Sequence, residues 1–360
     1  MSRLALVLTT TALAGLLAWP AGKKSKPEES QTLDLPTELP AAVVAEAGRL
    51  RFRVTPLSAR GLLTQQMRDG LKWLLSQDRG ATIVKLRAFV AGTGDTRRVQ
   101  TIVSETFTER RLPLPALSVV QIGPLPLEGA QVELEAVAAD KKVLNPHGLA
   151  FLSGPGAEAE QALAGLRAAV GAAGIDPGDV LLATCYLSSL DDLAGVRARA
   201  YAEFPHAAFD FIQRMREPLQ SLAQCEAVAR LRQRPAQPLM FLDPPGWPSS
   251  PGRSGIALVG GRQVALTGAQ LAFGFNEAAA RLAFQRLAKA LDGVGASYSR
   301  VAVAEVYPLS RSIADLVRKV EPEFFDRTRP PAGVMLPFEG LPSLDASFAL
   351  DAIAVLPDSP

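Results

Sequence analysis

The same pattern of residues occurs three times along the chain, and this repeat constrains the fold more than any other feature. Three short segments read Glu-Leu-Glu-Ala-Val-Ala, Gln-Cys-Glu-Ala-Val-Ala and Ala-Leu-Asp-Ala-Ile-Ala, and they begin at Glu133, Gln224 and Ala349. Alternation of side chains with a period of two is typical of a β-strand. A second alternating segment precedes each of these, at 117–122, 207–213 and 333–338. The chain is therefore expected to contain three copies of one structural unit.

Each copy also contains two helices and a further strand. Apolar residues recur at helical spacing over 63–75, 158–170 and 277–291. A strand-like run follows each of these helices, at 82–90, 180–187 and 301–307. A second helix then ends in an acidic–aromatic turn, which contains Phe107, Phe204 and Phe325 in the three copies. The order strand, helix, strand, helix, strand, strand predicts an α+β fold built from three βαβαββ units.

The spacing of the copies defines the expected domains. Glu135, Glu226 and Asp351 occupy the same place in the three copies, and the second interval is the longer one. The additional residues lie in a segment whose prolines disfavour both helix and sheet. We expect units at 48–140, 141–232 and 255–360, with a proline- and glycine-rich linker at 233–254.

The units are expected to shield one another. Each has helices for only one face of its sheet, and the other face must also be covered. Three units in one chain can close into a ring with the sheets inside and the helices outside, which leaves no apolar face exposed. The sequence therefore predicts an intramolecular pseudotrimer, and a monomeric chain.

The N-terminal residues are typical of an exported protein. Arg3 precedes an apolar run over 4–19, followed by small residues and a basic cluster at 23–26. This pattern indicates a signal peptide at 1–21, or an uncleaved anchor that tethers the chain to a membrane. Residues 22–47 are rich in Pro, Ser, Glu and Lys, and we expect them to be a flexible linker. The expected localisation is periplasmic or secreted.

Composition excludes several classes of function. The chain has two histidines and two cysteines, too few for a zinc site of the usual kind. Its formal net charge is only +2, whereas nucleic-acid binding requires concentrated positive charge. Glycine pairs such as Gly260-Gly261 lack the spacing of a phosphate-binding loop. We therefore expect no metal, no cofactor and no nucleic-acid partner.

The third copy resembles the RidA/YjgF family of reactive-intermediate deaminases. The similarity rests on Val-Ala-Leu-Thr-Gly at 264–268, Leu-Ala-Lys-Ala-Leu-Asp-Gly-Val-Gly at 287–295 and the segment 324–332. The second and first copies share parts of it, so that the resemblance covers about residues 49–357. Members of this family form homotrimers of a small α+β unit with helices outside a barrel-like core. The resemblance implies the same arrangement here, within one chain.

The site residues of the family are only partly present. The family has an arginine after Pro-Ala that binds a substrate carboxylate, and this chain has Leu117, Gly333 and Ala208 or a neighbour at those places. The family's glutamate corresponds to Glu133, and its hydroxyl corresponds to Ser153 and Thr267. The resemblance therefore implies a catalytic role for Glu133 and substrate binding by Ser153 and Thr267. Alternatively, Glu133 is a solvated glutamate at the end of a strand, and the hydroxyls of Ser153 and Thr267 serve only the turns in which they lie.

The resemblance also places the strands of Cys185 and Cys225 side by side. In an oxidising compartment the two cysteines can form a disulfide if their Cα atoms lie within about 7 Å. Two buried thiols are the alternative.

The leading hypothesis is a protein that binds a small organic metabolite in clefts between units, with weak or lost catalysis. An alternative is a retained imine or enamine deaminase, a hydrolase of C=N bonds, in which another arginine replaces the missing one. Candidates for that arginine are Arg53, Arg87, Arg214, Arg216 and Arg262. Further alternatives are a chorismatase-like enzyme and a structural protein of the cell envelope.

Overall fold

The computed structural model describes residues 38–78, 80–92, 95–216, 222–244 and 252–357. The expected signal peptide or anchor at 1–21 and most of the linker at 22–47 lie outside these residues. Among the helices of the described part, none has both the length and the apolar character needed to cross a membrane.

Three sheets repeat one strand order. In the first, β2 (Leu50–Val54), β5 (Val132–Ala139), β3 (Thr82–Ala91) and β4 (Ala116–Ile122) are neighbours in that sequence. In the second, the corresponding strands are β6 (Leu149–Ser153), β10 (Leu222–Arg230), β8 (Val180–Leu187) and β9 (Ala208–Gln213). Both β4 and β9 run parallel to their neighbours, and the other pairs are antiparallel. The repeated order confirms the βαβαββ unit expected from the sequence.

The third sheet keeps this order with an irregular last strand. It contains β13 (Gln263–Thr267), β16 (Ala346–Val355) and β15 (Val301–Pro308). The strand expected at 333–338 is wrong, because this segment forms only isolated parallel bridges, from Ala332 to Val303 and from Met335 to Val306. Prolines at 330, 331 and 337 remove backbone N–H donors, which explains why a continuous ladder does not form.

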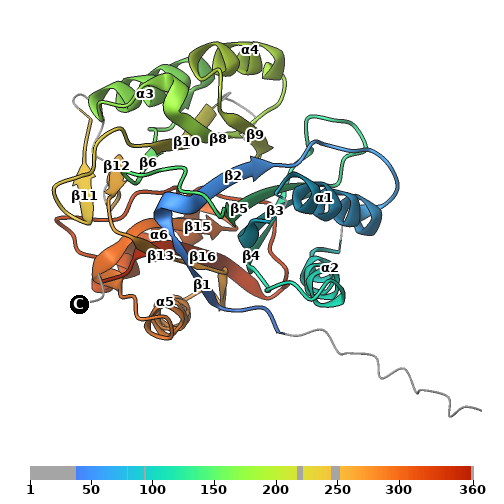
Figure 1. Cartoon of the computed structure of the whole chain (residues 1–360). Helices are drawn as coiled ribbons and strands as arrows, with labels where there is room; N and C mark the ends of the chain where they lie inside the picture. Colours follow the sequence, from blue (N-terminus) through green and yellow to red (C-terminus); the bar gives the residue numbers. More distant parts are fainter. Residues whose placement is uncertain (1–37, 79, 93–94, 217–221, 245–251, 358–360) are drawn as a thin grey trace, which may run out of the picture. The chain divides into compact units, whose positions relative to one another are not determined.

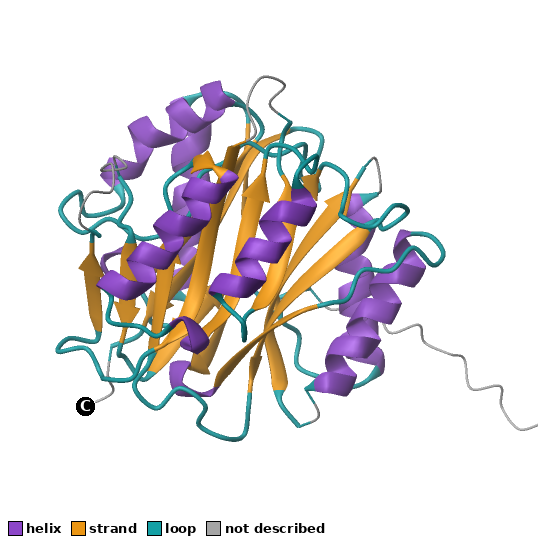
Figure 2. Cartoon of the chain, turned by 90° about the horizontal axis from the view of Figure 1, so that it is seen from above, coloured by secondary structure: helices purple, strands orange, loops and turns teal. Residues whose placement is uncertain are grey.

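Two helices cover the outer face of each sheet (Figures 1 and 2). They are α1 (Leu63–Gln77) and α2 (Thr96–Glu109), α3 (Ala159–Ala172) and α4 (Leu193–Glu203), and α5 (Glu277–Asp292) and α6 (Arg311–Val320). In α1, the buried residues Leu63, Met67, Leu71 and Leu74 follow a period of three to four and pack on β3 and β5. Each helix pair thus encloses its own apolar core.

Shorter elements complete the chain. They are the 3-10 helices η1 (Ala47–Arg49), η2 (Pro177–Asp179), η3 (Tyr298–Arg300) and η4 (Glu321–Glu323), and the short strands β7 (Ala157–Glu158) and β14 (Gln270–Phe273).

Three strands lie where the sequence predicted no strand. Some of them also pair with a strand of another unit's sheet. β1 (Ala42–Glu46) pairs with β13 of the third sheet, so that the expected linker at 22–47 is wrong from Ala42 onward. β11 (Leu239–Leu242), within the expected linker at 233–254, pairs with β12 (Ile256–Val259), which in turn joins β6. The prolines lie outside the four apolar residues of β11, at the edge of the sheet, where they interrupt no ladder.

The inner faces of the three sheets pack against each other in two apolar layers. One layer includes Leu50, Leu149, Leu182, Leu266 and Val303. The other includes Phe89, Tyr186, Tyr307 and Phe338. On β8 and β15, the inward-facing residues of the two layers are four positions apart: Leu182 and Tyr186 on β8, and Val303 and Tyr307 on β15. The position between them is polar in every sheet, and it defines the candidate site.

Candidate functional site

A set of polar side chains occupies equivalent positions on the inner faces of the three sheets. The register places Arg87 opposite Glu135, Thr184 opposite Glu226, and Glu305 opposite Asp351. We call these six residues the polar layer. Each pair joins the middle strand of a unit to its last strand. Because strands buried on both faces are normally apolar throughout, charged residues at these positions are unusual.

Arg87 is the central cation of the polar layer. Its Nε and Nη2 donate to Oε2 of Glu135 at 2.6 and 2.5 Å, and Nη2 also lies 2.9 Å from Oε1 of Glu226. Thr184 donates to the other oxygen of Glu135. The hydroxyl of Tyr186 donates to Oε1 of Glu226 at 2.8 Å. Arg87 thus joins the first and second units through charge-assisted hydrogen bonds.

Lys85 joins the first and third units in a similar way. Its Nζ lies 2.9 Å from Oδ1 of Asp351 and donates to the carbonyl of Thr267 at 2.8 Å. Ser118 donates to Oδ2 of Asp351. Burial lowers the pKa of Lys85, while the adjacent Asp351 carboxylate acts in the opposite direction.

Glu305 differs from the other carboxyl groups because no cation is paired with it among the described residues. Its Oε2 accepts a hydrogen bond from the backbone N–H of Val334 at 3.1 Å. Only 6% of the residue is exposed. Burial raises the pKa of Glu305 well above its ordinary value, and the negative charge of Glu226 raises it further. Glu305 therefore holds its proton more strongly than an exposed glutamate does.

The polar layer borders a cavity of about 80 Å³. Its charged and hydroxyl-bearing lining consists of Lys85, Arg87, Glu135, Ser153, Thr184, Glu226, Glu305 and Asp351. Its apolar walls include Phe52, Val137, Phe151, Leu182, Val228, Val303 and Ile353. All three units contribute to both groups. Val137, Val228 and Ile353, each two residues beyond a carboxylate of the polar layer, are half-buried.

The three positions of the family's arginine carry other residues. Leu117 is paired with Leu86 and Phe209 with Ala183, so that Phe209, rather than Ala208, is the equivalent residue in the second unit. Gly333 has a φ of +118°, and an added Cβ would lie 2.3 Å from the carbonyl oxygen of Ala304. An arginine cannot occupy this backbone position without displacing β15.

The two predicted substrate-binding hydroxyls occupy different environments. Ser153 lines the cavity, and its Oγ accepts a hydrogen bond from the N–H of Gly333 at 2.8 Å. Thr267 is fully buried, and its Oγ1 accepts one from the N–H of Ala352 at 2.8 Å. Ser153 is paired with Glu226 of the polar layer. In the third unit Leu266 is paired with Ile353, so that Thr267 lies opposite Ala352 and not opposite Asp351, the equivalent of Glu226. Thr267 is therefore displaced by one residue relative to Ser153, and only Ser153 borders the cavity.

Glu133 lies on β5 with a second carboxyl group beside it. It is 6% exposed, and burial raises its pKa to about 7, whereas the neighbouring Asp210 of β9 opposes this shift. The pKa of Asp210 is raised well above its ordinary value by burial and by the charge of Glu133. A solvated glutamate, the simpler expectation, is therefore wrong. The pair connects the first and second units.

Four of the five arginines proposed as replacements are engaged elsewhere, and the fifth, Arg214, is 4% exposed. Arg53 lies 3.4 Å from Asp78, Arg216 lies 3.6 Å from Asp191 and Arg262 lies 3.8 Å from Glu46. Arg87 belongs to the polar layer. The guanidinium whose charge acts on Glu133 is that of Arg197 in α4. Arg197 was not among the candidates from the sequence, because a helical arginine is ordinarily read as solvated.

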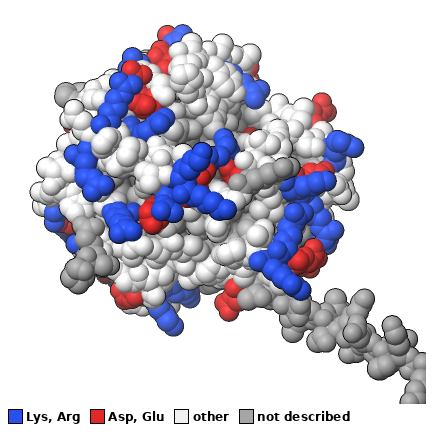
Figure 3. Space-filling view, viewed as in Figure 1, with Lys and Arg blue, Asp and Glu red and all other residues white. Residues whose placement is uncertain are grey.

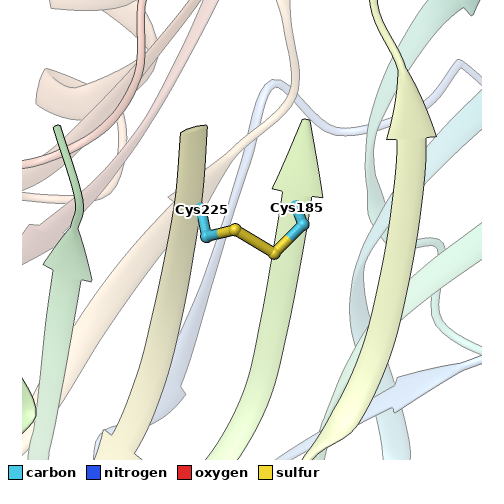
Figure 4. Close-up of a disulfide and its surroundings, with 2 residues drawn as sticks. All are labelled: Cys185 and Cys225. Carbon is cyan, nitrogen blue, oxygen red and sulfur yellow. A yellow bond between two sulfur atoms is a disulfide. The ribbon is translucent and has the colours of Figure 1, made fainter. Parts of the chain in front are cut away.

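Cys185 and Cys225 form a disulfide between β8 and β10 (Figure 4). They are directly opposite in register, with Cα atoms 4.1 Å apart. Both belong to the core beneath α3 and α4, on the opposite face of the sheet from Thr184 and the cavity. The bond therefore fastens the second unit and takes no part in the candidate site.

The described residues contain no group of three or more His, Cys, Asp or Glu side chains arranged to hold a metal ion. The polar layer is instead a mixture of cations, carboxyl groups and hydroxyls, which suits an organic molecule better than a bare metal ion.

Several solved structures are similar to this chain. The chain resembles the Rid-family protein YyfB from Yersinia pestis, at 20% identity over 33% of this chain and 100% of that one, with a TM-score of 0.31. It resembles Rv2704 of the YjgF family from Mycobacterium tuberculosis at 22% identity, over 33% and 99% of the two chains, with a TM-score of 0.25. A chorismatase matches at 14% identity over 85% and 98%, with a TM-score of 0.26. No curated protein matches the sequence.

A protein-family model described as Endoribonuclease L-PSP, the family that includes RidA and YjgF, matches residues 63–140. The match covers α1 through β5, the part of the first unit that contains Arg87 and Glu133. The sequence of the first unit therefore matches the RidA/YjgF family.

Proposed function

We propose that this chain is a pseudotrimer that binds a small organic molecule in the cavity where its three units meet, without the deamination chemistry of its family. The observation that carries the proposal is the cavity itself, which has apolar walls and charged groups from all three units. Ligand sites are typically concave and mostly apolar, with a few polar groups that fix orientation.

The loss of the family's chemistry rests on the three arginine positions. Leu117, Phe209 and Gly333 cannot donate charge-assisted hydrogen bonds to a carboxylate. Each such bond typically contributes about 1.5–3 kcal/mol. A substrate carboxylate therefore has no equivalent anchor at any of the three places, and the ligand is expected in the central cavity instead.

A large side chain at the apolar wall of the cavity is expected to weaken ligand binding. Val228 is half-buried at the apolar wall, and Val228→Trp introduces a side chain large enough to occupy the space. Ligand-observed NMR with a panel of short amines, alcohols and acids should detect binding to the wild-type chain. We expect Val228→Trp to weaken it more than tenfold, and Val143→Trp, at an exposed valine, to have no effect. Equal binding by both variants, or none by the wild type, would contradict the proposal.

A second candidate function is an imine deaminase at Glu133. A general acid–base group works best when its pKa lies near the operating pH, and the pKa of Glu133 is raised to about 7. Ammonia release from imines generated from amino acids tests this function. We expect no difference between the wild type and Glu133→Ala. Rapid ammonia release by the wild type that disappears in Glu133→Ala would establish a deaminase and refute the proposal that this activity has been lost.

We also propose that the chain is exported and works as a monomer. The disulfide supports export, because such bonds persist mainly in oxidising compartments. The near-neutral net charge argues against a nucleic-acid partner. On the face shown in Figure 3, basic side chains lie in several groups divided by uncharged surface and acidic residues.

A further inference from the structure

One wall of the cavity carries three oxygen-bearing side chains, two of which lie next to Gly333. Ser153 and Glu226 face each other across β6 and β10, and the N–H of Gly333 donates to Oγ of Ser153. A Cβ on Gly333 would lie 3.1 Å from Oε1 of Glu305. We call Ser153, Glu226 and Glu305 the acceptor wall. It lies where the family resemblance would place an arginine in the third unit.

Two oxygens of the acceptor wall have no partner among the described residues. Both oxygens of Glu135 are satisfied, by Arg87 and Thr184. Glu226 uses Oε1 for Arg87 and Tyr186, which leaves Oε2 free, and Glu305 uses Oε2 for Val334, which leaves Oε1 free. Glu305 is nevertheless more than nine-tenths buried and lines the cavity. Buried acceptors of this kind normally have a hydrogen-bond donor.

The charges around the cavity are unbalanced. Two cations, Lys85 and Arg87, face four carboxyl groups that also line it. The cations are fully engaged with Asp351, Glu135 and Glu226. The protein supplies no third cation to this layer within the described residues, so an added positive charge would be stabilised there and an added negative charge repelled.

We infer that the cavity selects a short organic cation, namely a primary ammonium group on a small apolar body. This inference rests on the proposed function and names its class of ligand. An ammonium group has three N–H donors, which match Oε2 of Glu226, Oε1 of Glu305 and a lone pair of Ser153. The apolar body then contacts Val228, Val303 and Ile353.

The size of the cavity limits the ligand. A cavity of about 150 Å³ accommodates benzene, so that about 80 Å³ accommodates about three non-hydrogen atoms. The ammonium group of butylammonium and its first carbons fill this space, and the rest of the butyl chain extends toward the half-buried Val137, Val228 and Ile353. The maximum of about 1.5 kcal/mol per atom limits its affinity to the micromolar range at best.

Binding of a cation is expected to depend on pH. Burial and the negative charge of Glu226 raise the pKa of Glu305, whereas a bound ammonium favours its ionised form. Affinity should therefore increase with pH, by up to tenfold per unit below that pKa. The charged and titratable groups that face Glu305 are Glu226, Arg87, Asp351, Lys85, Tyr186 and Tyr307.

The test compares three ligands that share a butyl body. NMR titrations of butylammonium, 1-butanol and butanoate at pH 6, 7 and 8 would use the full chain, Glu305→Gln and Glu109→Gln. We expect butylammonium to bind at least tenfold tighter than 1-butanol, and more tightly as pH rises. Glu305→Gln, which keeps an acceptor for Val334, should lose this preference and the pH dependence. Glu109→Gln, at an exposed residue, should retain both.

The outcomes separate the two proposals. Binding of 1-butanol or butanoate as tight as that of butylammonium would overturn the cation inference and leave a ligand-binding cavity. The absence of binding by any of the three would contradict the cavity proposal as well. The pH dependence of the wild type tests the inference even if Glu305→Gln fails to fold.

Discussion

Arg87→Met is expected to lower the free energy of unfolding by about 3–5 kcal/mol, the usual cost of breaking a buried ion pair from one side. The Arg87 side chain is 10% exposed, and its guanidinium bonds to both Glu135 and Glu226. Its removal leaves two carboxylates without a cation, while methionine conserves most of the volume. Chemical denaturation at pH 7 measures the loss. Double replacement with Glu135→Gln should recover part of it.

The matched control is Arg97→Met at the start of α2. The Arg97 side chain is 71% exposed, and its ion pair with Asp95 is a surface pair. Such pairs contribute at most about 1 kcal/mol. A similar, small loss in both variants would contradict the view that the polar layer holds the first and second units together.

Glu133→Gln is expected to stabilise the protein at alkaline pH. The pKa of Glu133 is about 7 in the folded chain, against an ordinary value of 4.5. Between these values the folded state holds a proton that the unfolded state has released, so that stability falls as pH rises from about 4.5 to 7. The shift corresponds to about 3 kcal/mol. Glutamine does not ionise, and the variant should therefore gain up to this amount at pH 8 and little at pH 4.

Denaturation of Glu133→Gln and the exposed-site control Glu128→Gln at pH 4 and pH 8 measures this effect. The control should follow the wild type at both values. A variant that is less stable than the wild type at pH 8 would show that the Glu133 carboxylate is stabilised in the fold, which is the opposite of the expected result.

Most elements follow from the sequence because their side-chain periods are regular. The helix at α1 and the strands β3, β8 and β15 begin within a residue of their expected limits. β1 and β11 were missed because their short apolar runs stand among linker-like residues and gain stability only from pairing with β13 and β12. Pairing with distant strands, rather than the local preference of the residues, determines the strand conformation of β1 and β11.

The candidate site was harder to predict than the fold. Glu133 was identified, but the neighbouring carboxyl group of Asp210 belongs to another unit, which no local pattern reveals. Ser153 and Thr267 looked equivalent because each precedes a glycine, yet register places them on different faces. The charged residues Lys85, Arg87 and Glu305 within otherwise apolar strands were the available signal of the polar layer.

A crystal structure of the chain soaked with butylammonium tests most directly whether the central cavity is the binding site. We predict density for the ligand in the cavity between the three sheets, with its nitrogen within about 3 Å of carboxylate oxygens of Glu226 and Glu305. An empty cavity, with the ligand bound instead beside Leu117, Phe209 or Gly333, would contradict this prediction.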